Sequence, residues 1–317
     1  MTNLKRVRPP LDKERQARFI FGGVLRVATI VVLGLVVPGV ARAAPVKLGD
    51  RPLLALAARG GEAYAVIESG DPASPLALVS PGARPQPFGA PGAESPEIVA
   101  GAGGVEVAWE RQVSSGLEIL AGDPAGAKPI AVATTPPQLD GDGTLAYSDR
   151  DGNVVRGDVR LTSDAPEHRH LPLDAAEGRV LDLDQRRTIT QLRLLGPDAP
   201  NLPALSLPRL ADVQGSLAIA GNAAYVAYAL DERIYLATAA LEPQARWTIR
   251  KLSNDGAGRP AVVRTARKTY VAFSRAGGIY VNGKRIGNGG RPQLATDGTE
   301  VFVGWTREGG AMLEKAG

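Results

Sequence analysis

A two-part phrase recurs along this chain: a short apolar run that follows a proline, a polar turn, and a second apolar run that ends in an aromatic residue. The clearest copies are Ser95-Pro-Glu-Ile-Val99 with Val105-Glu-Val-Ala-Trp109, Arg259-Pro-Ala-Val-Val263 with Thr269-Tyr-Val-Ala-Phe273, and Arg291-Pro-Gln-Leu-Ala295 with Val301-Phe-Val-Gly-Trp305. Short runs of this kind, bounded by Gly, Asp, Asn and Pro, are typical of β-strands and tight turns. The phrase therefore predicts a repeated unit built from short antiparallel strands.

The copies return about every 40 residues when they are aligned on the residue that ends the second strand. The aligned residues are Ile67, Trp109, Tyr147, Thr190, Tyr228, Phe273 and Trp305. This period is typical of four-stranded propeller blades. Arg and Gln residues interrupt the fourth copy, around residues 180–195, so counting it gives seven blades and treating it as an insertion gives six. We predict an all-β chain that forms a single β-propeller of seven blades, with six as the alternative.

The two ends of the repeat pattern predict a closed ring. The last copy begins at Arg291 and leaves room for only three strands. The stretch Val46-Lys-Leu-Gly-Asp-Arg51-Pro52 has the same form as the segments that lead into Arg259-Pro260 and Arg291-Pro292. We therefore expect residues 45–49 to supply the outer strand of the last blade, which would remove an exposed sheet edge.

Residues 1–43 have the pattern of an export signal. A basic stretch precedes an uncharged apolar run over residues 27–41, and Ala41-Arg42-Ala43 has the small-x-small form of a signal peptidase site. We predict cleavage after Ala43, a propeller domain over residues 44–317, and a secreted or cell-envelope location. The alternative is a retained membrane anchor, although the uncharged run is shorter than the ~20 residues that a spanning helix needs.

Charge and cysteine content exclude several classes of function. The chain has 37 Lys and Arg against 33 Asp and Glu, but eight of the basic and two of the acidic residues lie in residues 1–43. The remainder therefore has 29 basic and 31 acidic residues, and this balance gives no reason to expect nucleic-acid binding. The chain has no cysteine, which excludes disulfides and thiolate chemistry.

At these residues the chain resembles secreted bacterial β-propellers of the sialidase-like and WD40-like classes, and the repeat rhythm covers residues 45–317. The resemblance implies the fold and no catalytic residues. Sialidase-like repeats carry a Ser-x-Asp-x-Gly-x-Thr-Trp box, whereas the nearest stretch here, residues 148–154, has Arg150 where the box has its Asp. WD40 repeats close with Trp-Asp, and no Trp of this chain is followed by Asp.

Three arginines stand directly before a proline at the start of a predicted inner strand: Arg51, Arg259 and Arg291. Ring closure would place them on contiguous blades near the central channel, where guanidinium groups could bind a carboxylate or phosphate. In the alternative interpretation they are structural, because a residue before proline is held extended and an arginine there can pair with acidic neighbours or lie in solvent.

Loops between the second and third strands add charged residues on the same predicted face, and the candidates there are Glu110, Asp149 and Arg307. Charged loops also occur on any soluble surface. Acid–base catalysis would need two carboxylates in one pocket, for which Glu110 and Asp149 are the candidate pair.

His168 and His170 are the only histidines. Two histidines at i and i+2 on a strand would project from one face, as two metal ligands do. Glu167 is the only further ligand in view, and the segment has the character of an outer strand at the rim. We therefore predict a solvated pair and neither a metal nor another cofactor.

Taken together, these features predict an exported, non-catalytic scaffold that binds a protein, a glycan or an anionic small molecule on one face. We expect a monomer that contacts a membrane only if the leader is retained. The alternative is a sialidase-like glycoside hydrolase or lyase that acts on a carboxylate-bearing sugar.

Overall fold

The computed structural model describes residues 44–197, 202, 204–208 and 213–316. The chain divides into the units Met1–Ala41 and Arg42–Gly317. The predicted export signal over residues 1–43 lies outside the described residues. All regular secondary-structure elements of the described part are β-strands. The described residues contain no helix that is long and apolar enough to span a membrane.

Seven antiparallel sheets of four strands each form the second unit, and we number them as blades 1 to 7 in chain order. Blade 1 contains β2 (Leu53–Arg59), β3 (Glu62–Asp71), β4 (Ser74–Val79) and β5 (Gln86–Phe88). Blade 2 contains β6 (Ala93–Gly101), β7 (Gly104–Val113), β8 (Gly116–Gly122) and β9 (Lys128–Ala133). Blade 3 contains β10 (Gln138–Leu139), β11 (Leu145–Ser148), β12 (Val154–Arg156) and β13 (Val159–Arg160).

The remaining blades follow the same order. Blade 4 contains β14 (His168–Ala176), β15 (Arg179–Arg186), β16 (Thr190–Leu195) and β17 (Leu205–Leu207). Blade 5 contains β18 (Gln214–Ala220), β19 (Ala223–Leu230), β20 (Arg233–Ala240) and β21 (Thr248–Lys251). Blade 6 contains β22 (Ala257–Arg264), β23 (Thr269–Arg275), β24 (Gly278–Val281) and β25 (Lys284–Asn288). Blade 7 contains β26 (Gly290–Thr296), β27 (Val301–Arg307), β28 (Gly310–Ala316) and β1 (Val46–Gly49).

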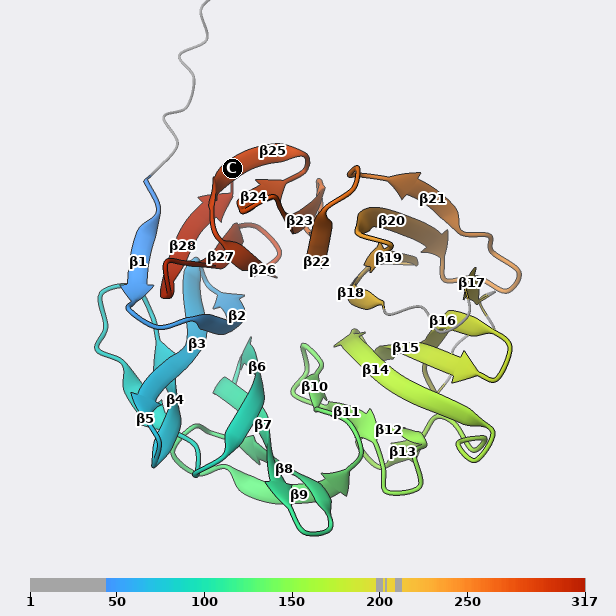
Figure 1. Cartoon of the computed structure of the whole chain (residues 1–317), viewed down its shortest axis with the longest axis horizontal. Coiled ribbons are helices and arrows are strands. Elements are labelled where there is room, and N and C mark those ends of the chain that lie inside the picture. Colours follow the sequence, from blue (N-terminus) through green and yellow to red (C-terminus); the bar gives the residue numbers. More distant parts are fainter. Residues whose placement is uncertain (1–43, 198–201, 203, 209–212, 317) are drawn as a thin grey trace, which may run out of the picture. The chain divides into compact units, whose positions relative to one another are not determined.

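The blades stand around a common axis, with the first strand of each blade innermost (Figure 1). The prediction of a seven-bladed β-propeller is therefore confirmed. A single blade has two apolar faces, and its neighbours bury them. Between blades 1 and 2, for example, Val66 and Phe88 pack against Trp109, whose ring lies edge-on to Phe88 at 5.4 Å between centroids.

The N-terminal strand closes the ring as predicted. β1 pairs with β28 in antiparallel register, with Val46 opposite Leu313 and Lys47 opposite Met312. Leu48 is buried and belongs to the core cluster that joins blade 7 to blade 1. The pairing covers the edge of β28 that would otherwise present free backbone groups.

Blade 4 differs from the alignment of the repeats. Thr190, which was expected to end the second strand of the fourth copy, lies at the start of the third strand, β16. The second strand is β15, which ends at Arg186. The expected aromatic residue is missing from β15, which explains why the sequence phrase could not be recognised there.

Candidate functional site

Five of the seven innermost strands contain a shift in register, and in blades 6 and 7 it falls on the Arg-Pro pair. Arg259 and Arg291 have φ angles of 54° and 53°, in the left-handed region. The extended conformation expected for these two residues is therefore wrong. A bulge places two residues of one strand opposite one of the next, and it redirects the side chains at the insertion.

These bulges lie at one end of the central channel, in a cavity of about 430 Å³ that we call the channel mouth. Every blade contributes to its lining from its first strand or the residue just before it: Leu54, Glu97, Gln138, Asp174, Gln214, Arg259 and Arg291. The opposite end of the channel is lined mostly by small and aliphatic residues, such as Ala58, Ile98 and Ile219. Charged residues line both ends; those of the mouth are Glu97, Asp174, Arg259 and Arg291.

Two of the predicted arginines meet at the channel mouth. Burial lowers the pKa of Arg259, and the nearby positive charge of Arg291 lowers it further. Among the ion pairs of the described residues, none includes either guanidinium group. These two exposed cations on neighbouring blades thus have hydrogen-bond donors available for an anion.

Two carboxyl groups that sequence reasoning missed face the same cavity. Burial raises the pKa of Glu97 to about 8, and the charge of Asp174 contributes to the increase. Burial raises the pKa of Asp174 to about 6, although the backbone N–H groups of Leu217 and Ala175 donate to it at 2.7 and 2.8 Å. At neutral pH, Glu97 is therefore mostly neutral and Asp174 is mostly charged.

The signal for these two carboxyl groups is weak in the sequence. Glu97 follows the proline of the repeated phrase, in the position that Ala261 and Gln293 occupy in blades 6 and 7. Only the alignment of inner strands shows that such a residue lines the channel. Asp174 lies at the corresponding position of blade 4, but that blade lacks the repeated phrase, so the alignment gives no signal for it.

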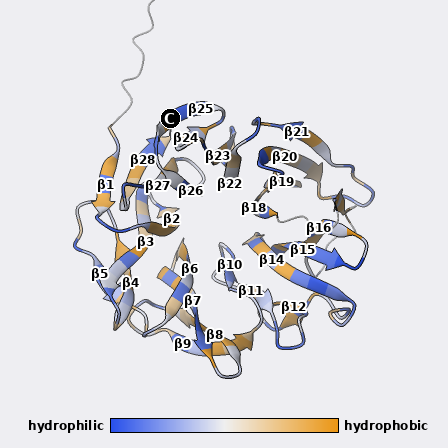
Figure 2. Cartoon of the chain, viewed as in Figure 1, coloured by the Kyte–Doolittle hydropathy of each residue, from blue (hydrophilic) through white to orange (hydrophobic). Residues whose placement is uncertain are grey.

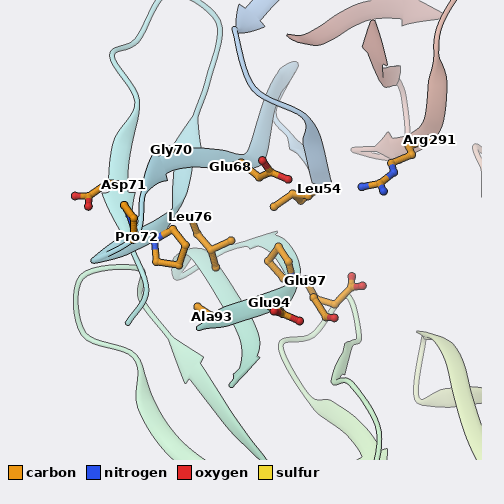
Figure 3. A pocket seen from close by; sticks show the side chains of 13 residues that line it. Leu54, Glu68, Gly70, Asp71, Pro72, Leu76, Ala93, Glu94, Glu97 and Arg291 are labelled. Carbon is orange, nitrogen blue, oxygen red and sulfur yellow. The ribbon is translucent and has the colours of Figure 1, made fainter. Parts of the chain in front are cut away.

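A second cavity, the side pocket, opens between blades 1 and 2 and has a volume of about 630 Å³. It shares Leu54, Glu97 and Arg291 with the channel mouth, so the two cavities adjoin, and we call them together the groove. Figure 3 shows the Arg291 side chain pointing into this pocket from blade 7, while Leu76 and Ala93 provide apolar surface. The groove can therefore hold a molecule with both an apolar and an anionic part.

Arg51 does not join the other two arginines. It is exposed, and a Cβ atom added to Gly70 would lie 2.6 Å from its Nη2 atom, so its guanidinium group rests on blade 1. Arg51 lines neither the channel mouth nor the side pocket. Arg307 is also separate from them: it ends β27, lies 3.6 Å from Glu308, and lines a small depression with Lys47 and Asp50.

The predicted carboxylate pair belongs to two different networks. Glu110 is buried on β7 and accepts a hydrogen bond of 2.8 Å from the Ser95 hydroxyl, which itself lines the side pocket. Burial raises the pKa of Glu110. Asp149 caps the turn after β11, where it accepts from the amide of Asn153 and from the guanidinium group of Arg160 at 2.7 Å.

The histidine pair is not where the sequence suggested. His168 and His170 begin β14, the innermost strand of blade 4, so the prediction of an outer strand at the rim is wrong. His170 is only 3% exposed, which also contradicts the prediction of a solvated pair. The ring of His170 instead contacts the carboxylates of Asp164 and of the buried Asp182.

Comparisons with known proteins support the fold. No protein-family model matches the chain, and no curated protein matches it. The β-propeller domain of Cps50 (Swd1) from Myceliophteria thermophila superimposes with a TM-score of 0.54 at 10% identity, over 87% of this chain and 99% of that one. This likeness agrees with the propeller fold and shows nothing further.

Two other solved structures are more distant. The subtype N11 neuraminidase-like protein of an H18N11 flat-faced bat virus gives a TM-score of 0.45 at 12% identity, over 87% of this chain and 97% of that one. A prolyl endopeptidase gives 0.47 at 12% identity, over 83% of this chain. The chain spans 46% of the length of that endopeptidase.

Proposed function

We propose that this propeller binds a small carboxylate-bearing molecule in the groove formed by the channel mouth and the side pocket. The observation that carries the proposal is the pair of guanidinium groups, Arg259 and Arg291, that face the channel mouth without an ion-pair partner among the described residues. Because burial and the charge of Arg291 already lower the pKa of Arg259, an anion between the two guanidinium groups would relieve an existing cost.

The surroundings favour a small molecule with a polar body. Glu97, which is mostly protonated at neutral pH, can donate a hydrogen bond, and Gln138 and Gln214 add amide groups at the same mouth. Leu54 and Leu76 offer apolar contact in the side pocket. Cavities of 430 and 630 Å³ are in the range that small-molecule sites occupy. An acidic sugar combines the required groups.

The leader predicted from the sequence adds a location to the proposal. A chain with a basic stretch, an apolar run and Ala41-Arg42-Ala43 is suited to export, so we place this binding activity outside the cytoplasm. Detection of the protein in the periplasmic or culture fraction would test this part separately from the ligand.

Calorimetric titration of the full-length protein with D-glucuronate, citrate and inorganic phosphate tests the binding site, and D-glucose serves as the neutral counterpart of glucuronate. We expect at least one of these anions to bind and glucose to bind much more weakly. A hydrogen bond to a charged group contributes about 1.5–3 kcal/mol, so Arg259→Gln and Arg291→Gln should each weaken binding about 10- to 100-fold.

Arg250→Gln is the matched control, because Arg250 is an exposed arginine on β21 away from both cavities. It should bind as the unmodified protein does. The proposal is refuted if the Arg259→Gln, Arg291→Gln double variant binds an anion as tightly as the unmodified protein does. It is also refuted if none of the three anions binds to the unmodified protein.

A second candidate function, a glycoside hydrolase or lyase, is favoured by one observation. Glu97 and Asp174 face the same cavity with pKa values of about 8 and about 6, so one carboxyl group is protonated while the other is charged. Such separation is what general acid–base chemistry requires. Turnover of a 4-nitrophenyl glucuronide that Glu97→Gln abolishes would support this activity. Binding without turnover would support the scaffold.

A further inference from the structure

Blade 4 carries an aspartate where every other blade has a large apolar side chain. The inner strands can be aligned on the residue that follows the bulge or its counterpart, which pairs with a second-strand residue, as in Glu97↔Ala108, Asp174↔Leu181 and Gln293↔Gly304. The next residue of the second strand is Asp182 in blade 4, and in the others it is Ile67, Trp109, Tyr147, Tyr228, Phe273 or Trp305. In Figure 2, the outer ends of β14 and β15 are correspondingly hydrophilic.

Asp182 belongs to a group of five ionisable residues that we call the blade-4 cluster: Asp164, His168, His170, Asp182 and Asp184. The His170 ring lies between two carboxylates, with Nδ1 2.8 Å from Asp182 and Nε2 3.0 Å from Asp164. His168 Nδ1 lies 2.8 Å from the other oxygen of Asp164 and 3.4 Å from Asp184 Oδ1. The side chains of His170, Asp182 and Asp184 have no solvent exposure.

The cluster contains the donor atoms and the spacing of a metal site. One atom from each of Asp164, His168 and His170 lies within 4.8 Å of the others. Two atoms bound tetrahedrally to zinc at 2.0–2.1 Å are about 3.4 Å apart. The separations of 2.8 to 3.4 Å between nitrogen and oxygen atoms here are therefore compatible with neighbouring ligands of one small ion.

Unpartnered buried atoms point to the same place. Asp184 Oδ2 accepts from Arg186 at 2.9 Å and from Arg193 at 3.0 Å. Its Oδ1 is buried and has no hydrogen-bond partner among the described residues. His168 Nδ1 faces it at 3.4 Å; this nitrogen lies 2.8 Å from Asp164 Oδ2 but makes no hydrogen bond among the described residues. A buried carboxylate oxygen without a partner is costly. A cation bound to His168 Nδ1 would lie near the Asp184 carboxylate and offset its charge.

Asp182 has the arrangement of a group that orients a metal ligand. A histidine that binds metal through one ring nitrogen usually donates its other N–H to a carboxylate, which fixes the tautomer. If His170 donates from Nδ1 to Asp182, its Nε2 presents a lone pair toward the Asp164 oxygen. This explains why an aspartate replaces the aromatic residue on β15.

From these observations we infer that Asp164, His168 and His170 bind one divalent transition-metal ion, with Asp184 beside His168. Zinc is suited best to two imidazoles and a carboxylate. Asp164 lies in the connection between blades 3 and 4 and is 39% exposed, so it provides access for the ion. The ion would tie this connection to β14, beside a blade 3 whose strands are only two to four residues long.

The site could not be found from the sequence because its third ligand comes from the turn. Glu167 was the only candidate next to the histidines, and it is exposed. Asp164 reaches both rings because the chain turns between Asp164 and His168, where the His168 amide donates to the Asp164 carbonyl at 3.1 Å.

The test is the zinc content of the purified full-length protein after incubation with zinc sulfate and dialysis, measured by plasma mass spectrometry. We expect about one zinc per chain, and a melting temperature that chelation with EDTA lowers and added zinc restores. At a free zinc concentration about 100 times Kd the increase should be about 5 °C or more. His168→Gln should lose the zinc, and Asp182→Asn should weaken its binding about 10- to 100-fold.

Glu167→Gln is the matched control, since it changes a neighbouring carboxylate outside the cluster and should retain the zinc. The His168→Gln variant should keep the circular dichroism spectrum of a β protein, because its side chain is at the partly exposed end of the cluster. A wild-type protein that retains no zinc, or a melting temperature that zinc raises equally in His168→Gln, would overturn the inference and leave a metal-free network of ion pairs.

Discussion

The indole nitrogen of Trp305 donates a hydrogen bond of 3.0 Å to the carbonyl oxygen of Asn288. This bond ties the core of blade 7 to the outer strand of blade 6. The indole lies against the glycines on either side of Asn288: a Cβ atom at Gly287 would be 3.1 Å from the ring, and one at Gly289 would be 2.8 Å from it. The glycine-rich segment between the two blades is thus shaped by the tryptophan that it covers.

We expect Gly289→Ala to destabilise the protein strongly. Gly289 has a φ of 139°, and an added Cβ would lie 2.2 Å from the carbonyl oxygen of Thr306 as well as close to Trp305. A backbone clash of this kind, added to the unfavourable φ, should lower the free energy of unfolding by about 2–4 kcal/mol. Urea unfolding followed by Trp fluorescence measures the change. Gly290→Ala is the control, because a Cβ there meets no atom within 4 Å, and an equal loss in that variant would contradict the explanation.

Loss of the buried contact of β1 should open blade 7. Leu48 is 9% exposed and packs with residues of blades 1 and 7, whereas Val46 on the same strand is 50% exposed. Leu48→Ala should cost about 2–3 kcal/mol, and Val46→Ala less than about 0.5 kcal/mol. Hydrogen exchange of the β28 amides should accelerate only in the Leu48 variant. Unchanged protection of β28 would show that β1 contributes little to closure.

Stability should decrease between about pH 4.5 and pH 8 because of Glu97. The pKa of Glu97 is raised from 4.5 to about 8 in the folded state, so in this window the native protein binds more protons than the unfolded chain. Stability therefore falls as pH rises and is lowest, for this group, above pH 8. Each unit of the shift corresponds to about 1.4 kcal/mol as an upper bound.

Glu97→Gln separates this effect from that of other groups. The variant should be more stable than the unmodified protein above pH 8 and should lose less stability across the window. Asp174, whose pKa is raised to about 6, should still contribute the lower part of the slope in both proteins. Urea midpoints at a series of pH values test the prediction, which is wrong if the two proteins have parallel profiles.

Repulsion between Arg259 and Arg291 should make stability depend on salt. Raising NaCl screens the two like charges, so the unmodified protein should gain more stability from salt than Arg291→Gln does. We expect the difference to be ~0.5 kcal/mol, the usual scale for a partly exposed pair. Arg250→Gln again serves as the control for the general effect of removing a charge. Equal salt dependence in all three proteins would mean that the two guanidinium groups do not interact.

Much of the architecture could be predicted from the sequence because each strand carries its own signal. The segment before Arg51-Pro52 has the same form as the segments before the other Arg-Pro pairs, and this likeness is enough to place β1 on the last blade. Blade 4 could not be aligned, because the position that an aromatic residue marks elsewhere is Asp182. That residue depends on His170 of another strand, and such a dependence leaves no periodic pattern.

Only part of the candidate site could be predicted from the sequence. Arg259 and Arg291 reach the channel mouth because the bulge in their strands falls on the Arg-Pro pair itself. In blade 1 the shift in register lies between Leu53 and Ala55, after the proline, so Arg51 stays outside the strand. The position of a bulge depends on pairing with the next strand, which the local sequence does not specify.

The pairing of β1 with β28 has a consequence for biosynthesis. The ribosome makes β1 before any other strand of the propeller, but it makes the partner strand, β28, last. β1 therefore stays unpaired until the last blade has been translated. During that interval β28 and its hairpin do not exist, and the nascent chain has no way to complete its final sheet.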